Sequence, residues 1–121
     1  MQQRRPRLEG KVAIVTGAGA RATGPRAGTG NAISVTFARE GAKMLLVDRS
    51  FSNAEDTHAS IQAEGGEASV FEGDVTNSAH CKGMVEAARE RYGRLDILVN
   101  NAGIFCPRGL RRTRGLRRRR A

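Results

Sequence analysis

The sequence has little of several residue types, and each shortage excludes a class of protein. Only two cysteines occur in 121 residues, Cys81 and Cys106, and they do not have the spacing of metal ligands. This scarcity favours reduced thiols over disulfides and the cytoplasm over an oxidising compartment. No apolar run approaches the roughly 18–20 residues that span a bilayer, and no apolar segment follows the basic N-terminus as in a signal peptide. We therefore expect a cytoplasmic protein with no membrane partner and no metal site.

Acidic residues are missing from one part of the chain, residues 106–121, which contain eight arginines. The other 13 of the 21 Lys and Arg residues are offset by all 12 acidic residues, so residues 1–105 are nearly neutral. We expect a domain over residues 8–105 and a disordered Arg-rich tail over residues 106–121. The few residue types of the tail favour a GC-rich gene translated out of frame. A genuine disordered tail, or nonspecific binding to nucleic acid phosphates, stays open, although the tail has no aromatic residues between its arginines.

The body alternates short apolar runs with segments of helical periodicity. The apolar runs are typical of strands buried on both faces of a parallel sheet, and they cover residues 12–15, 44–47, 68–71 and 97–99. The predicted helices cover residues 31–40, 53–64 with Asn53 as a candidate cap, and a third from a cap at Thr76, Asn77 or Ser78 to about residue 92. This alternation predicts an α/β fold with a doubly wound parallel sheet and right-handed crossovers.

A glycine-rich segment joins the first predicted strand to the first predicted helix. Gly17 follows the strand, and Gly28, Thr29 and Gly30 precede the helix. Glycines allow the backbone to approach a pyrophosphate, which the positive end of the helix dipole stabilises.

An acidic residue, Asp48, ends the second predicted strand. A carboxylate there accepts hydrogen bonds from the hydroxyls of an adenosine ribose and repels a 2′-phosphate, which favours NAD. Arg49 offers a partner to a 2′-phosphate, so NADP stays open as the cofactor.

Four motifs in this order together resemble the short-chain dehydrogenases/reductases. They occupy residues 10–19, 28–30, 73–76 and 100–103, with Asp48 between the second and third. The resemblance covers about residues 8–104 and implies a Rossmann-like sheet cut to about four strands, in the order 3-2-1-4. It also implies a nicotinamide dinucleotide as cofactor and hydride transfer to or from an alcohol or carbonyl as the family reaction.

The resemblance also assigns roles to individual residues. Gly17, Gly28 and Gly30 correspond to the pyrophosphate turn, with Thr29 as a further cofactor-binding candidate, and Asp48 corresponds to the residue that holds the adenosine ribose, while Arg49 is the candidate partner of a 2′-phosphate. Asp74 and Val75 correspond to the border of the adenine ring. Asn100, Ala102 and Gly103 correspond to the ribose on the nicotinamide side.

The sequence departs from the family pattern at two places. Residues 18–27 separate the first two motif glycines, a longer segment than the family usually has, and Arg21 or Arg26 within it could contact the phosphates. The family's catalysis uses a tyrosine, a lysine four residues later and a serine. The only tyrosine here is Tyr92, and Asp96 stands four residues after it.

We therefore expect no catalytic residue in this chain and no activity from it alone. The usual oligomer interface of the family is expected to be missing as well, and strand 97–99 would be an exposed edge. The alternative is a non-catalytic nucleotide-binding module whose tail binds nucleic acid nonspecifically.

Overall fold

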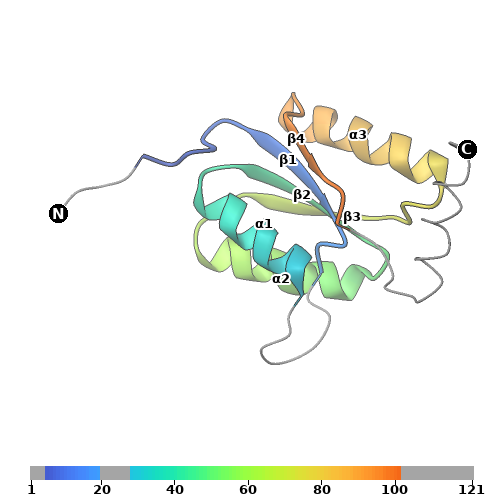
Figure 1. The fold of residues 1–121 in the computed structure, drawn as a ribbon, viewed down its shortest axis with the longest axis horizontal. Coiled ribbons are helices and arrows are strands. Elements are labelled where there is room, and N and C mark those ends of the chain that lie inside the picture. Colours follow the sequence, from blue (N-terminus) through green and yellow to red (C-terminus); the bar gives the residue numbers. More distant parts are fainter. Residues whose placement is uncertain (1–4, 20–27, 102–121) are drawn as a thin grey trace, which may run out of the picture.

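The fold was analysed in a computed structural model that describes residues 5–19 and 28–101. The described residues alternate strands and helices along the chain (Figure 1). The elements are β1 (Val12–Thr16), α1 (Thr29–Arg39), β2 (Lys43–Asp48), α2 (Phe51–Ala63), β3 (Ala68–Glu72), α3 (Ser78–Tyr92) and β4 (Ile97–Val99). The predicted arginine-rich tail lies outside the described residues.

The four strands form one parallel sheet in the order β3-β2-β1-β4. β1 and β2 are central, and Ile14 lies opposite Leu45 on one side and Leu98 on the other. Parallel neighbours require a crossover connection, and here each crossover contains one helix. The α/β class and the predicted strand order are confirmed.

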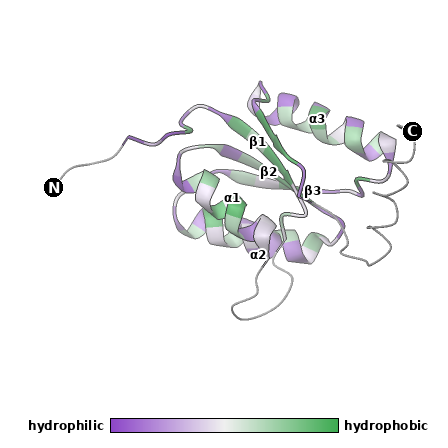
Figure 2. Cartoon of the chain, in the orientation of Figure 1, coloured by the Kyte–Doolittle hydropathy of each residue, from purple (hydrophilic) through white to green (hydrophobic). Residues whose placement is uncertain are grey.

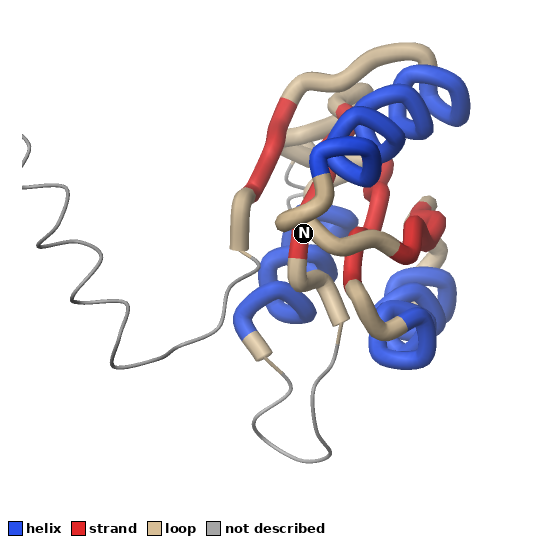
Figure 3. Tube along the Cα trace, turned by 90° about the vertical axis from the view of Figure 1, so that its right-hand side faces the viewer, coloured by secondary structure: helices blue, strands red, loops and turns tan. Residues whose placement is uncertain are grey.

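Helices cover both faces of the sheet. α1 and α2 lie against one face and α3 against the other, as Figure 1 and the turned view in Figure 3 show. Alternate residues of β1 therefore enter different cores: Val12 and Ile14 pack towards Met84 of α3, whereas Ala13 and Val15 pack towards the side of Ile61 of α2. Because both faces are buried, the central strands are apolar at consecutive positions, which is visible as continuous green in β1 in Figure 2.

The helix starts differ in part from the prediction. Asn53 is not the cap of α2, because the helix begins earlier and the Ser50 hydroxyl accepts a hydrogen bond of 3.3 Å from the Asn53 backbone N–H. Asn77, one of three candidates, caps α3 by accepting from the N–H groups of Ala79 and His80. A side-chain oxygen at an N-cap stabilises a helix by about 1 kcal/mol.

One edge of the described sheet is β4, which pairs with β1 alone among the described strands. Leu98 is 52% exposed, whereas Ile97 and Val99 are half-buried against the core on the α1 and α2 side. The exposed edge predicted for this strand is thus confirmed for the described residues.

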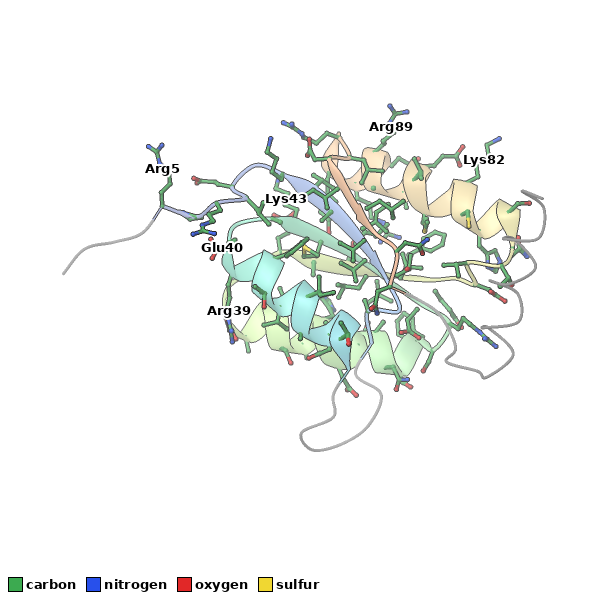
Figure 4. All side chains as sticks on the ribbon, in the orientation of Figure 1. Arg5, Arg39, Glu40, Lys43, Lys82 and Arg89 are labelled. Carbon is green, nitrogen blue, oxygen red and sulfur yellow. The ribbon has the colours of Figure 1, made fainter. Side chains whose placement is uncertain are left out.

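The outer surface of α3 carries charged side chains. Lys82 and Arg89 project away from the sheet in Figure 4, and both are exposed. Within the described residues, no helix has the length and apolar character needed to cross a bilayer.

Candidate cofactor-binding site

The residues singled out in the sequence meet at one edge of the sheet. Thr16, Asp48, Glu72 and Val99 end the four parallel strands, and the loops that follow these strands begin at this edge. In open α/β sheets, ligands bind in the crevice outside the carboxyl ends of the strands, where the strand order reverses. That reversal lies here between β1 and β4, since β2 and β3 continue to the other side.

The glycine segment brings two stretches of backbone into direct contact. A β-carbon added at Gly30 would overlap the carbonyl oxygen of Gly17, so only glycine fits at position 30. Gly17 has φ +64° and Gly28 has φ +108°, both in the region that favours glycine. Gly28 is the N-cap of α1 and has no side chain to cover the first turn of the helix, where Thr29 begins. The backbone N–H groups at this end and the positive dipole of α1 suit an anion.

Asp48 lies at the end of β2 and is held in place by backbone groups. Its Oδ2 accepts a hydrogen bond of 2.9 Å from the Gly19 N–H, and its Oδ1 accepts one of 2.8 Å from the Ser50 N–H. The side chain is half-buried, and each carboxylate oxygen has a second lone pair for a ligand hydroxyl. Arg49, the next residue, is exposed.

Asp74 lies in the turn between β3 and α3, and its carboxylate is fixed by Thr76. Hydrogen bonds from the Thr76 hydroxyl (2.7 Å) and backbone N–H (2.9 Å) lower the pKa of Asp74, with a smaller contribution from the charge of Arg49. The Asp74 N–H donates to Nδ1 of His80 at 2.9 Å. Val75 is half-buried, and its carbonyl accepts from the Cys81 thiol.

The end of β4 is tied to the end of β1 by polar side chains. Thr16 Oγ1 accepts from the Asn101 N–H at 3.0 Å and lies 3.3 Å from Oδ1 of Asn100. The Asn101 amide Nδ2 donates to the carbonyl of Gly17 at 3.2 Å. Asn100 is exposed at this edge, whereas Ala102 and Gly103 lie outside the described residues. The asparagines that follow β4 are therefore connected directly to Thr16 and Gly17, where β1 ends and the glycine-rich turn begins.

Three residues of this site were not proposed individually from the sequence. Thr16 and Asn101 connect β1 to β4, and Gly19 donates to Asp48. A β-carbon at Gly19 would lie 2.5 Å from Cβ of Asn53 and 2.8 Å from both the Asn53 backbone and Oδ2 of Asp48, so this glycine is also required by close contact. The only signal for them in the sequence is their position within the two motifs. Arg21 and Arg26 lie outside the described residues.

Tyr92 does not lie at this edge. It is the last residue of α3, and its hydroxyl donates to the Met44 carbonyl of β2 at 3.1 Å and lies 2.9 Å from the Ser69 hydroxyl. Burial raises the pKa of Tyr92, contrary to what a base would need. No group of His, Cys, Asp and Glu side chains in the described ranges could hold a metal ion.

A family model described as short chain dehydrogenase matches residues 11–116 of the chain. A curated relative from Methylorubrum extorquens, described as an uncharacterized oxidoreductase, is 40% identical over 100 residues. The match covers 82% of this chain and 38% of that relative.

Solved structures agree in fold and in sequence. A Burkholderia xenovorans protein described as a short-chain dehydrogenase/reductase has a TM-score of 0.79 and 45% identity, covering 84% of this chain and 40% of its own. A Haemophilus influenza protein described as a D-mannonate oxidoreductase, solved with bound NAD, has a TM-score of 0.71 and 28% identity, covering 84% of this chain and 34% of its own. The chain thus spans well under half the length of these relatives.

Proposed function

The chain belongs to the short-chain dehydrogenase family, and from this membership we propose that it is the part of an oxidoreductase that binds a nicotinamide dinucleotide. One observation carries the proposal: Gly30, at the start of α1, lies directly against the carbonyl of Gly17, and Gly19 in the same turn donates to Asp48. This contact packs the start of α1 closely against the end of β1, and no side chain caps the backbone N–H groups at the first turn of the helix, where a pyrophosphate would bind. When bound, the cofactor supplies hydride acceptance or donation, while this chain holds and orients it.

Each part of the site has a role in binding. Gly17, Gly28 and Gly30, with Thr29, receive the pyrophosphate at the positive end of α1. Asp74 and Val75 border the adenine. Asn100 faces the ribose on the nicotinamide side, with Ala102 and Gly103 after it in the same motif.

The cofactor we propose is NAD rather than NADP. The Asp48 carboxylate stands at the end of β2 with both oxygens oriented by backbone N–H groups. It suits the two ribose hydroxyls and repels a 2′-phosphate. Exposed Arg49 works against this preference, so we expect NADP to bind more weakly rather than not at all.

We further propose that the 121-residue chain alone does not transfer hydride. It contains no Tyr-x-x-x-Lys sequence, and the hydroxyl of its only tyrosine bonds within the fold. The chain also spans only 34–40% of the relatives described above. We keep the cytoplasm as its location, as predicted from the sequence.

Calorimetric titration of the full chain with NAD and NADP tests the binding proposal. We expect saturable binding of NAD and weaker binding of NADP, and a chain that binds neither would contradict the proposal. Inactivity is tested separately by following the absorbance of NADH in the presence of NAD and a panel of alcohols. A full-length relative serves as the positive control, and NAD-dependent oxidation by this chain would refute inactivity.

A second candidate function rests on the eight arginines of residues 106–121. An Arg-rich segment binds nucleic acid phosphates with a strong salt dependence. Under this alternative, deletion of residues 106–121 abolishes binding to DNA or RNA and leaves NAD binding intact. Equal nucleic acid binding with and without these residues would exclude a role for the tail.

A further inference from the structure

Thr57 is a polar residue in the buried face of α2. It is fully buried, and the two other buried residues of this helix, Ala54 and Ile61, are apolar. Valine would fill this position with a similar volume, so packing alone does not require a hydroxyl. A buried hydroxyl is retained without loss only where it is hydrogen-bonded.

The Thr57 hydroxyl connects three segments that are distant in sequence. Oγ1 donates to the carbonyl of Ala18 at 2.8 Å and accepts from Nδ2 of Asn31 at 2.7 Å. One donated and one accepted bond use the hydroxyl proton and a lone pair of the same oxygen. Thr57 thus joins α2 to Ala18, in the turn that follows β1, and to Asn31, in the first turn of α1.

These two contacts lie immediately beside the groups that define the turn. Ala18 follows Gly17, and its N–H donates to the Val47 carbonyl at 3.1 Å. Asn31 follows Gly30, the residue that touches Gly17. Thr57 therefore fixes the relative position of the two backbone segments between which a pyrophosphate would bind.

We propose that Thr57 is a positioning residue for the pyrophosphate of the dinucleotide, acting through Ala18 and Asn31 and not by touching the ligand. This inference rests on the proposed function. Without the hydroxyl, the carbonyl of Ala18 and the amide of Asn31 lose their shared partner. The turn then adopts its binding geometry for a smaller fraction of the time, and the apparent affinity falls by that fraction.

The test compares three variants of the full chain by calorimetric titration with NAD. Thr57→Val removes the hydroxyl and keeps the volume, and we expect its Kd for NAD to rise by about tenfold. Thr57→Ser restores the hydroxyl, and we expect its Kd to return to within about twofold of the parent. Ile61→Val, one turn along the same buried face, is the matched control: it lowers stability without touching the turn and leaves Kd unchanged.

Amide hydrogen exchange without ligand provides a second measurement. We expect faster exchange at the N–H groups of Gly19 and Ala32 in Thr57→Val than in Ile61→Val, since both groups lie in the anchored segments.

A parent that binds no NAD overturns the proposed function. A parent that binds NAD with Thr57→Val equal to it overturns the role of Thr57 alone, as does a Thr57→Ser variant that rescues nothing. Equal exchange in the two valine variants overturns the anchoring itself.

Discussion

The backbone N–H of Gly19 donates a hydrogen bond of 2.9 Å to Oδ2 of Asp48, across 29 residues of sequence. A β-carbon at Gly19 would lie 2.5 Å from Cβ of Asn53 and 2.8 Å from the same oxygen, so the close packing here requires glycine. The glycine turn after β1 and the acid at the end of β2 are therefore one structural unit. Changes at either residue should affect both stability and cofactor choice.

Asp48→Asn should weaken NAD binding and reduce the preference for NAD over NADP. The amide keeps one oxygen acceptor but loses the charge that strengthens hydrogen bonds to ribose hydroxyls and repels a 2′-phosphate. Hydrogen bonds to charged groups contribute about 1.5–3 kcal/mol, so we expect NAD affinity to fall by at least about tenfold. Calorimetric titration with both dinucleotides measures the change.

Arg49→Ala is the matched control for this change, because Arg49 is adjacent and exposed. We expect it to leave NAD binding unchanged and to weaken NADP binding. If Asp48→Asn leaves the ratio of the two affinities unchanged, Asp48 does not select the cofactor.

Gly30→Ala should destabilise the fold strongly. The added methyl would overlap the Gly17 carbonyl oxygen, and backbone atoms cannot move aside as a side chain can. Overpacking of this kind costs about 1–3 kcal/mol or more, which urea denaturation followed by circular dichroism would measure. Gly83→Ala in α3 is the control: its β-carbon would lie 3.2 Å from the ring of Phe71, and we expect a change within about 1 kcal/mol. Similar losses in both variants would argue against a special role for position 30.

Much of the fold could be predicted from the sequence because both faces of the sheet are covered. Consecutive apolar residues in β1 and β2 mark strands buried on both sides, and the alternation with helices fixes a parallel order. The start of α2 could not be predicted as well. Ser50 and Asn53 both suit a cap, and the turn at the end of β2, in which the Ser50 N–H donates to Oδ1 of Asp48, places the start of the helix at Ser50.

Site residues could be predicted where a motif requires one residue type at one position. Gly17, Gly30 and Asp48 were predicted in this way. Thr57 was not, because it occupies an apolar-looking position in α2 and its partners Ala18 and Asn31 are 39 and 26 residues away. No local pattern reports a hydrogen bond of this sequence separation.

Asp96→Asn should reduce stability at neutral pH and flatten its acid dependence. The Asp96 carboxylate accepts from the Arg94 guanidinium and from the Val12 N–H at 2.9 Å, and these bonds lower the pKa of Asp96 below its ordinary value of 3.8. A lowered folded pKa adds stability above the unfolded value, and this stability is lost as the pH falls through the folded pKa. Urea midpoints of parent and variant should therefore differ near neutral pH and converge as the pH falls through the lowered folded pKa of Asp96, which lies below 3.8.

Glu64→Gln is the control for Asp96, because Glu64 also has a lowered pKa but pairs with Arg39 where both side chains are largely exposed. Exposed ion pairs contribute little to stability, so its effect should be smaller. Midpoints for Asp96→Asn that stay apart in acid would show that the loss comes from packing and not from the charge.

Tyr92→Phe should lower stability without affecting NAD binding. The variant removes the donor to the Met44 carbonyl and the partner of the Ser69 hydroxyl. The ring stays packed against the core between α3 and the sheet. Loss of one such bond costs about 1 kcal/mol, measured by urea denaturation, and the Kd for NAD from calorimetry should not change. A weaker NAD affinity at unchanged stability would contradict a purely structural role.

Leu98→Lys should reduce aggregation of the chain while leaving its stability unchanged. Leu98 is 52% exposed on β4, which has a pairing partner on one side only within the described sheet. Open strand edges pair with other chains, and a lysine at an edge opposes this pairing. We expect less light scattering at increasing protein concentration and an unfolding free energy within about 0.5 kcal/mol of the parent. Ile97→Lys is the control, because that side chain packs into the core and its charge should destabilise the fold. If Leu98→Lys scatters as strongly as the parent, the edge of β4 is not the surface through which the chains associate.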